Sequence, residues 1–255
     1  MISKEDILFP HSEIRNVQDE LIKEVLTSIE NKQHLIAHAP TGLGKTAASV
    51  PIALSYALKN NKTVFFLTSR HTQHKIVIDT LKQIKKEYNI SLIATDIIGK
   101  KWMCIQPGIE ILYSGEFADY CKKLKEDNKC DFYKNTKKNN KLTNKAQEVY
   151  EELKKSSPSH TEELIRICEQ EKICPYELAA LLTKESKVIV ADYNHVFDPA
   201  IKDSFFLRAG KEIEDSIIIV DEAHNLPKRA RENLTIRLTN VILKRAIKEA
   251  AKYGF

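Results

Sequence analysis

The chain has 255 residues, of which 42% are hydrophobic and 29% charged, a composition typical of a folded globular protein with a sizeable core. Its net charge of +5 favours an anionic partner only weakly. The sequence lacks a run of about 20 apolar residues and an apolar N-terminal leader, which excludes a membrane span and a signal peptide. We therefore expect a cytoplasmic protein, whose five cysteines do not form a disulfide framework.

Short apolar runs alternate with helical patterns in the first and last parts of the chain. Runs of strand length occupy 34–40, 63–69, 91–97, 187–193 and 216–224. A helical pattern separates the first two runs, and this alternation favours an α/β fold with a parallel sheet. Between 100 and 176 the alternation gives way to cysteines, a Lys/Asn tract and helical stretches at 146–155 and 161–170. The sequence therefore predicts one α/β domain with a cysteine-bearing insertion.

A glycine-containing loop, APTGLGKT, follows the first apolar run and opens a helical pattern. The backbone N–H groups of such a loop, together with the positive end of a helix, suit the phosphates of ATP. Lys45 would reach the β- and γ-phosphates, and the Thr46 hydroxyl would join the shell of a Mg²⁺ ion. The residues predicted to bind nucleotide here are Ala39, Thr41, Gly42, Gly44, Lys45 and Thr46.

A second phosphate motif follows the last apolar run, where Ile217 to Val220 lead into the tetrapeptide DEAH. A carboxylate at the end of an apolar strand can hold Mg²⁺, and we assign this role to Asp221. Glu222 would polarise the attacking water, and His224 would link the ATP site to nucleic acid. Two independent motifs thus predict the same ligand, ATP with magnesium.

Two weaker signals flank the loop. Arg15 and Gln18 precede a helix and resemble the adenine-recognition segment of superfamily 2 helicases, although a solvated helix start fits equally well. Residues 68–73, TSRHTQ, resemble motif Ia of the same helicases, which lies along the phosphates of a DNA strand. This motif nominates Arg70 as a DNA contact, and a polar loop at a strand end is the alternative.

Four cysteines, Cys104, Cys121, Cys130 and Cys174, are separated by 16, 8 and 43 residues, with Cys168 as a fifth. Four thiolates can hold either tetrahedral zinc or an iron–sulfur cluster. Zinc sites usually contain close cysteine pairs, and the wide spacing here slightly favours the larger cluster. Scattered structural cysteines are the remaining alternative.

The order of motifs between the loop and the DEAH box carries a family resemblance. The segments KKWMC at 100–104, CDFY at 130–133, CPY at 174–176 and DYNHVFDP at 192–199 follow one another in that order. Together with the phosphate motifs, they make residues 9–234 strongly resemble the XPD family of iron–sulfur DNA helicases. DinG- and FANCJ-type helicases are the neighbouring alternative.

This resemblance implies a domain organisation and a cluster. A RecA-like P-loop motor domain would span 1–99 and 177–233, a mainly helical 4Fe-4S insertion 100–176, and the start of an arch-like domain 234–255. In the family the last cluster ligand precedes Pro-Tyr, which nominates Cys104, Cys121, Cys130 and Cys174 as ligands and leaves Cys168 over. Lys100 and the lysine tract at 122–145 would face DNA phosphates, and Trp102, Phe132 and Tyr133 would stack on bases or pack around the cluster.

The implied function is ATP-dependent DNA unwinding, 5′→3′ by resemblance, with single-stranded DNA and a duplex junction as partners, in DNA repair or transcription. The motifs cover only the first motor domain. We expect the second RecA-like domain to come from the missing part of a longer chain or from another polypeptide, and this chain alone to have little activity. The alternatives are a non-motor ATP- and DNA-binding module with a redox-sensing cluster, and a zinc-containing ATPase.

Overall fold

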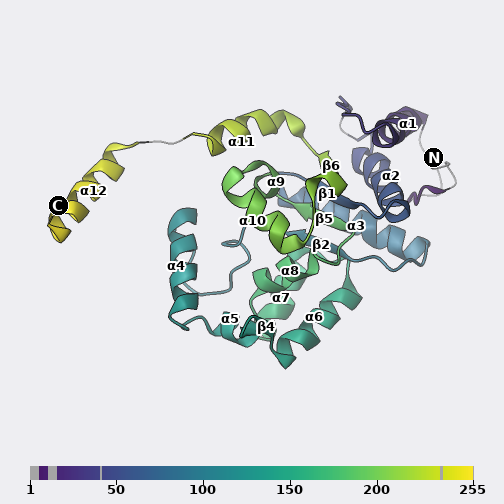
Figure 1. The fold of residues 1–255 in the computed structure, drawn as a ribbon. Helices are drawn as coiled ribbons and strands as arrows, with labels where there is room; N and C mark the ends of the chain where they lie inside the picture. Colours follow the sequence, from purple (N-terminus) through teal and green to yellow (C-terminus); the bar gives the residue numbers. More distant parts are fainter. Residues whose placement is uncertain (1–5, 11–15, 41, 236–237, 255) are drawn as a thin grey trace.

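A four-stranded parallel sheet with the order β2-β5-β1-β6 forms the centre of the computed structural model (Figure 1). The strands are β1 (Thr63–Leu67), β2 (Ala94–Ile97), β5 (Val188–Ala191) and β6 (Ser216–Val220). The structure describes residues 6–10, 16–40, 42–235 and 238–254. The predicted α/β fold with a parallel sheet is confirmed.

The two inner strands, TVFFL in β1 and VIVA in β5, are buried along their whole length. Such continuous apolar strands are expected where helices cover both faces of a parallel sheet. Val64 and Phe66 belong to the core on one face, whereas Phe65 and Leu67 belong to the core on the other. The helices over the first face are α2 (Lys45–Lys59) and α3 (His71–Glu87).

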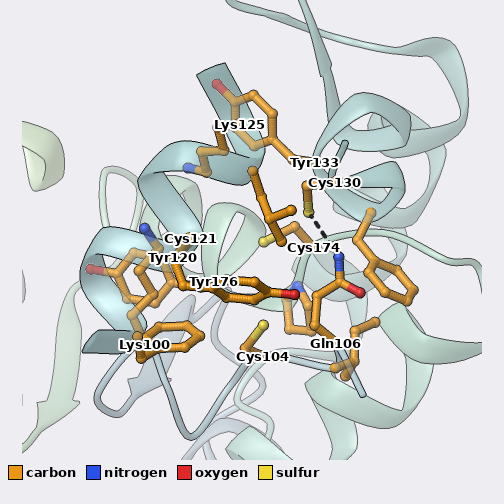
Figure 2. A pocket seen from close by; sticks show the side chains of 15 residues that line it. Lys100, Cys104, Gln106, Tyr120, Cys121, Lys125, Cys130, Tyr133, Cys174 and Tyr176 are labelled. Carbon is orange, nitrogen blue, oxygen red and sulfur yellow. Dashed lines mark hydrogen bonds between the residues drawn. The ribbon is translucent and has the colours of Figure 1, made fainter. Parts of the chain in front are cut away.

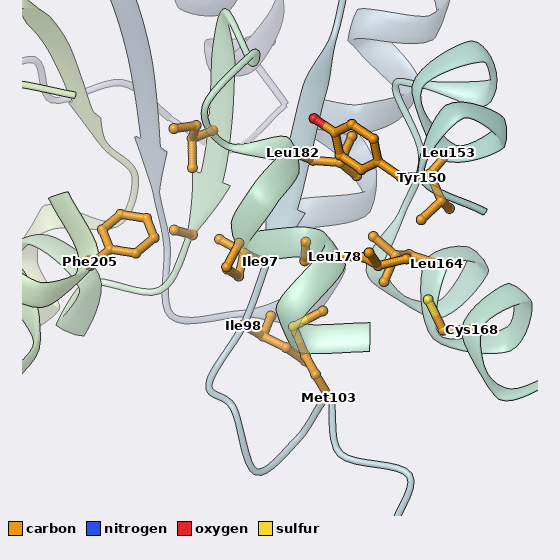
Figure 3. Close-up of a cluster of buried hydrophobic side chains, with 14 of the residues drawn as sticks. Ile97, Ile98, Met103, Tyr150, Leu153, Leu164, Cys168, Leu178, Leu182 and Phe205 are labelled. Carbon is orange, nitrogen blue, oxygen red and sulfur yellow. The ribbon is translucent and has the colours of Figure 1, made fainter. Parts of the chain in front are cut away.

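The second face is covered by helices from the middle and the later part of the chain (Figure 3). They are α6 (Asn144–Ser156), α7 (Thr161–Gln170), α8 (Pro175–Leu182) and α10 (Pro199–Ala209). The Phe65 ring lies with its centroid 6.2 Å from that of Phe205 and 5.1 Å from that of Phe206. Tyr150 and Leu164 belong to the same buried cluster. The cysteine-rich middle of the chain and the sheet therefore share one hydrophobic core.

The rest of the middle region is more lightly packed. Its elements are α4 (Ser114–Glu126), α5 (Asp131–Thr136) and a hairpin of β3 (Lys137–Lys138) and β4 (Lys141–Leu142). Helix α4 stands at the margin of the fold in Figure 1, and Phe117 is its only buried residue. Burial of one ring leaves α4 dependent on polar contacts for its position.

The remaining helices lie outside the two layers that cover the sheet. They are α1 (Asn16–Glu30), α9 (Asn194–Phe197), α11 (Leu226–Asn233), α12 (Asn240–Tyr253) and the 3₁₀ turns η2 (Ile213–Asp215) and η3 (Ala223–Asn225). Helix α10 starts at Asp198, whose carboxylate accepts a 2.9 Å hydrogen bond from the Ala200 N–H, and stops at Gly210 with φ of 59°. Nowhere in the described ranges does a helix have the length and apolar character that crossing a membrane requires.

Four of the five predicted strand runs contain strands, and the helices predicted at 146–155 and 161–170 are confirmed. The strand predicted at 34–40 is wrong. That segment has no regular secondary structure, and the Ile36 side chain is 98% exposed. An apolar run becomes a strand only where its backbone pairs with a neighbour, and 34–40 pairs with no strand of the described structure.

The two edges of the sheet differ. The outer edge of β2 is covered by residues 157–161, because the Ser157 hydroxyl bonds to the backbone N–H and C=O of Ala94 and Thr161 bonds to Asp96. On the other side, β6 (SIIIV) pairs only with β1, and its five residues are half-buried. Within the described ranges, the outer edge of β6 is therefore open.

We expect Phe65→Ala to lower the free energy of unfolding by about 3–5 kcal/mol, because it removes a buried ring at the centre of the shared core. Urea denaturation monitored by circular dichroism measures this change. Leu207→Ala is the matched control, since Leu207 is largely exposed on α10, and it should cost under about 0.5 kcal/mol. A similar small effect for Phe65→Ala would contradict a core shared by the sheet and α10.

Candidate functional site

The glycine-containing loop leads directly into α2. Gly42 and Gly44 have φ of 88° and 87°, a left-handed conformation that favours glycine, and Gly44 is the N-cap of the helix. The Lys45 ammonium donates a 3.1 Å hydrogen bond to the Ala39 carbonyl, so it folds back over the loop. This arrangement aims a helix N-terminus and a lysine at the same place, as phosphate binding requires. Thr41 lies outside the described residues.

Gln18, predicted to read adenine, is buried against this loop. Its side-chain amide donates a 2.8 Å hydrogen bond to the Leu43 carbonyl. A Cβ added to Gly44 would lie 2.3 Å from that amide nitrogen, so the Gln18 side chain would have to move, and the left-handed backbone angle is what favours glycine there. The structure thus brings Gln18 to the predicted phosphate site, whereas Arg15 lies outside the described residues.

Asp221 follows β6 and stays in the sheet through a 2.9 Å bond from its N–H to the Leu67 carbonyl of β1. Its Oδ2 atom is buried and has no hydrogen-bond partner among the described residues. Burial and the neighbouring Glu222 raise the pKa of the carboxyl, against the opposing charges of Lys45 and Arg70. A buried carboxylate oxygen without a donor, close to the loop lysine, fits a Mg²⁺ ligand.

The DEAH backbone is held by a tyrosine that sequence reasoning missed. Glu222 has φ of 51°, an uncommon left-handed conformation for a residue with a side chain. The buried Tyr193 hydroxyl donates to the Asp221 carbonyl and, at 3.1 Å, to the Glu222 carbonyl. The His224 ring lies with Nδ1 3.4 Å from a Glu222 carboxylate oxygen and is 70% exposed. Tyr193 lies two residues after the end of β5, and this position was the signal in the sequence that could have identified it.

The four nominated cysteines line one pocket (Figure 2). They come from a loop, from α4, and from the N-caps of α5 and α8: Cys104, Cys121, Cys130 and Cys174 respectively. The pocket contains about 460 Å³ of empty space, part of it open to solvent. Gln106 donates a 3.6 Å hydrogen bond to the sulfur of Cys130. Cys168 is fully buried in the shared core and does not line the pocket.

Burial affects the pKa of two of the pocket thiols. Burial raises the pKa of Cys104, and it raises that of Cys174 to about 12. Within the described ranges, no three His, Cys, Asp or Glu side chains converge as the ligands of one metal ion do. The four thiols thus share a cavity without the tight convergence of a zinc site, where each sulfur lies about 2.3 Å from the ion.

Basic side chains and aromatic rings complete the pocket wall. The Lys100 ammonium lies 5.7 Å from the Tyr176 ring centre, and the Lys125 ammonium lies 4.1 Å from that of Tyr133. Lys100, predicted to contact DNA, therefore faces the cysteine pocket. Trp102 is 64% exposed, and the Lys101 ammonium lies 5.2 Å from the centre of its ring.

Many side chains of the lysine tract at 122–145 pair with acidic residues of the protein itself. Six of its nine lysines form ion pairs within the protein: Lys122, Lys125, Lys129, Lys134, Lys137 and Lys145. Exposed pairs of this kind are weak and can exchange partners. Two of the six, Lys125 and Lys137, share the carboxylate of Glu177, which is 3% exposed. Arg208 also contacts it.

Glu177 itself was not singled out by sequence reasoning. Burial alone would raise the pKa of its carboxyl, but Arg208, Lys125 and Lys137 outweigh burial and lower it to about 2. The carboxylate is therefore ionised at every pH at which the protein is handled. Its cationic partners lie 31 to 52 residues away in the sequence, so no local pattern identified it.

The sequence model of the DEAD_2 family matches residues 66–243. Among curated proteins, the chain is 26% identical to a regulator of telomere elongation helicase 1 homolog of Caenorhabditis briggsae, over 98% of this chain and 27% of the relative. It is 25% identical to the general transcription and DNA repair factor IIH helicase subunit XPD/RAD3 of Saccharomyces cerevisiae, over 96% and 33%. The chain thus spans about a third or less of these relatives.

Two solved structures share the fold. An XPD helicase superposes with a TM-score of 0.58 and 23% identity, covering 86% of this chain and 34% of the other. A truncated XPD superposes with a TM-score of 0.56 and 23% identity, covering 90% and 59%.

We expect Asp221→Asn to raise the melting temperature of the ligand-free chain at pH 7. The pKa of the Asp221 carboxyl is higher in the folded than in the unfolded chain. The protonated carboxyl therefore stabilises the folded state at low pH, and this stabilisation is lost as the pH rises through the folded pKa. The stabilisation by Asn should therefore be larger at pH 7 than near pH 4. Thermal melts at both pH values measure it, and equal effects at both would contradict the burial of this charge.

We expect Tyr193→Phe to lower the free energy of unfolding by about 1–2 kcal/mol, because two carbonyls lose a buried donor. Nucleotide affinity should fall as well, since the DEAH backbone would no longer be held. Chemical denaturation and titration with a fluorescent ATP analogue measure the two effects. Tyr253→Phe is the control, because Tyr253 is exposed on α12, and equal behaviour of the two variants would refute the role of Tyr193.

Proposed function

Because this chain belongs to the DEAD_2 family, we propose that it is the ATP-binding portion of a DNA helicase, with an iron–sulfur insertion of the XPD type. The observation that carries the proposal is the meeting of two sequence-distant phosphate motifs. The unpartnered Asp221 oxygen at the end of β6 lies close enough to Lys45 for their charges to interact. The relatives' names include helicases, and the rest of the proposal depends on the geometry.

In the proposed ATP site, each side chain has one task. Lys45 exchanges its bond to the Ala39 carbonyl for the β- and γ-phosphates of ATP. Asp221 and Thr46 hold Mg²⁺, which neutralises phosphate charge. Glu222 orients the attacking water, and the left-handed backbone fixed by Tyr193 sets the direction of its carboxylate. Gln18 bonds to the Leu43 carbonyl of the loop, and it would read the edge of a bound adenine.

The cysteine pocket is the proposed cluster site. Cys104, Cys121, Cys130 and Cys174 would hold a 4Fe-4S cluster, whose iron–thiolate bonds would tie their four segments together. The pocket fits an anionic, sulfur-ligated group because Lys100 and Lys125 line the same wall. The wide spacing of the four cysteines along the sequence, without a close pair, slightly favours a cluster over a single zinc ion.

DNA would run along the side of the sheet where the strands end. Arg70 caps the N-terminus of α3 near Asp221 and would contact a phosphate, and exposed Trp102 would stack on a base of the single strand. The duplex junction would lie beyond the insertion, and movement would be 5′→3′. A second RecA-like domain, from a longer chain or another polypeptide, would complete the motor.

We retain the proposed division into a motor domain at 1–99 and 177–233, an insertion at 100–176 and an arch-like segment at 234–255. Helix α12, in the last segment, has no buried residue, which is consistent with the start of a further structure. An arginine supplied by the second motor domain would contribute a factor of roughly 10³–10⁵ to hydrolysis. This chain alone would therefore bind ATP and hydrolyse it slowly.

We expect Lys45→Ala to abolish ATP binding and to leave iron content unchanged, whereas Cys130→Ser should have the opposite effect. The measurements are titration with a fluorescent ATP analogue and iron and sulfide per chain on anaerobically purified protein. Roughly four of each with absorption near 400 nm would support the cluster. Zinc in place of iron would refute it and leave a zinc-containing ATPase.

The alternative is the non-motor module with a redox-sensing cluster. It would be supported if the protein contained the cluster and bound DNA but did not hydrolyse ATP, even after addition of a second motor domain. The helicase proposal requires that the completed motor hydrolyses ATP faster when single-stranded DNA is present. Steady-state phosphate release with and without an oligonucleotide distinguishes the two functions.

A further inference from the structure

One buried carboxylate binds three cations next to the cysteine pocket. The two oxygens of Glu177 lie 2.7 Å from the Lys125 ammonium, 2.7 Å from the Lys137 ammonium and 2.9 Å from a guanidinium nitrogen of Arg208. The Glu177 side chain is 3% exposed, and the two lysines are 21% and 23% exposed. A carboxylate in such surroundings keeps its charge only because these partners remain in place.

The three cations come from three different elements. Lys125 is on α4, one helical turn after Cys121, and Lys137 starts the hairpin that follows α5, whose N-cap is Cys130. Glu177 is in the first turn of α8, whose N-cap is Cys174. Three of the four cysteine-bearing segments therefore meet at one carboxylate.

The fourth element in the cluster is α10, which lies outside the cysteine-bearing region and packs on β1 through Phe205 and Phe206. Arg208 extends from α10 to Glu177, and its guanidinium lies 5.3 Å from the centre of the Tyr176 ring. Tyr176 also lines the pocket. The same carboxylate thus joins the pocket to the helix that covers the sheet.

The contact matters most for α4. This helix buries only Phe117, and Cys121 itself is partly exposed. The bond from Lys125 to Glu177 is a charge-assisted contact in a largely buried place, where such contacts are strongest. The position of Cys121 relative to Cys174 therefore depends on this bond.

The charges of the group also suit what the pocket would receive. Three cations around one carboxylate leave two positive charges beside the thiols. In the metal-free chain Glu177 offsets part of this charge and keeps the lysines from repelling one another. A set of thiolates or an anionic cluster would then be favoured electrostatically beside Lys125.

We propose that Glu177 is a positioning residue that assembles the cysteine pocket in advance of metal binding: it holds the segments of Cys121 and Cys130 against that of Cys174 and fixes all three to α10. This inference rests on the proposed function only in taking the cysteines as ligands. Each cation has its own task, since Lys125 positions α4, Lys137 positions the hairpin and Arg208 anchors the pocket to the motor domain.

The test uses the full chain without metal and measures hydrogen exchange by segment together with alkylation rates of individual cysteines. We expect Lys125→Met to raise exchange in 114–126 and alkylation of Cys121 by about tenfold or more, and to leave the hairpin unchanged. Lys137→Met should loosen the hairpin and Cys130 and leave α4 unchanged. Glu177→Gln should loosen both.

Glu171→Gln is the matched control. Glu171 pairs with Lys145 in the same region, at 2.8 Å and in an exposed position. Removal of this carboxylate should leave hydrogen exchange in α4 and in the hairpin as in the wild type. Exchange in β1 and β5 reports global stability. The proposal would be overturned if Glu177→Gln raised hydrogen exchange in β1 and β5 while Lys125→Met did not loosen α4 and Lys137→Met did not loosen the hairpin. Glu177 would then have a purely structural role.

Reconstitution with iron and sulfide provides the second measurement. Glu177→Gln should bind less iron than the wild type and show a weaker absorption near 400 nm, whereas Glu171→Gln should match the wild type. Equal loading of all three proteins, or wild-type protection of α4 in Lys125→Met, would refute the positioning role. If the wild type itself took up no iron, this result would count against the cluster. Hydrogen exchange of α4 and the hairpin in the metal-free chain would still decide the role of Glu177.

Discussion

The pairing of β1 with a strand on each side is the constraint on which the rest of the structure depends. β5 on one side leads into Tyr193, and β6 on the other leads into Asp221, whose N–H continues the ladder to Leu67. Because parallel strands end at the same edge, residues nearly 30 apart in the sequence meet there, and the Tyr193 hydroxyl bonds to the DEAH backbone. Arg70 enters the same region at the start of α3. The arrangement of the proposed ATP site therefore depends on strand register.

The sequence predicted those features whose signal is local. Apolar runs located β1, β5 and β6, and glycines before a helical pattern located the loop at Gly44. The run at 34–40 is also largely apolar and forms no strand, because apolar character does not reveal whether a partner edge is present. Tyr193 and Glu177 were missed for a related reason, since their roles arise from contacts between distant segments. The family resemblance selected the four cysteines that line one pocket, but it did not indicate the carboxylate behind them.

The cysteine-bearing region is not loosely attached to the sheet. Tyr150 and Leu164 pack in the same core as Phe65, and a buried polar contact reinforces this core on its edge. His74 of α3 is hydrogen-bonded to Asp96 at 2.6 Å, and Asp96 also accepts a bond from the Thr161 N–H at the start of α7. A displacement of the sheet during an ATP cycle would thus be carried into α7 and α8 with little loss, because close-packed cores transmit strain.

The bare outer edge of β6 has a consequence for handling the protein. Natural sheets protect such edges with charge, proline or a covering segment, and β2 is protected in this way by residues 157–161. The sequence of β6, SIIIV, has neither charge nor proline, and no described segment covers it. A short aliphatic strand with unpaired amides is a template for another chain. This edge of the sheet is therefore the place where a second chain could add a strand by backbone pairing alone.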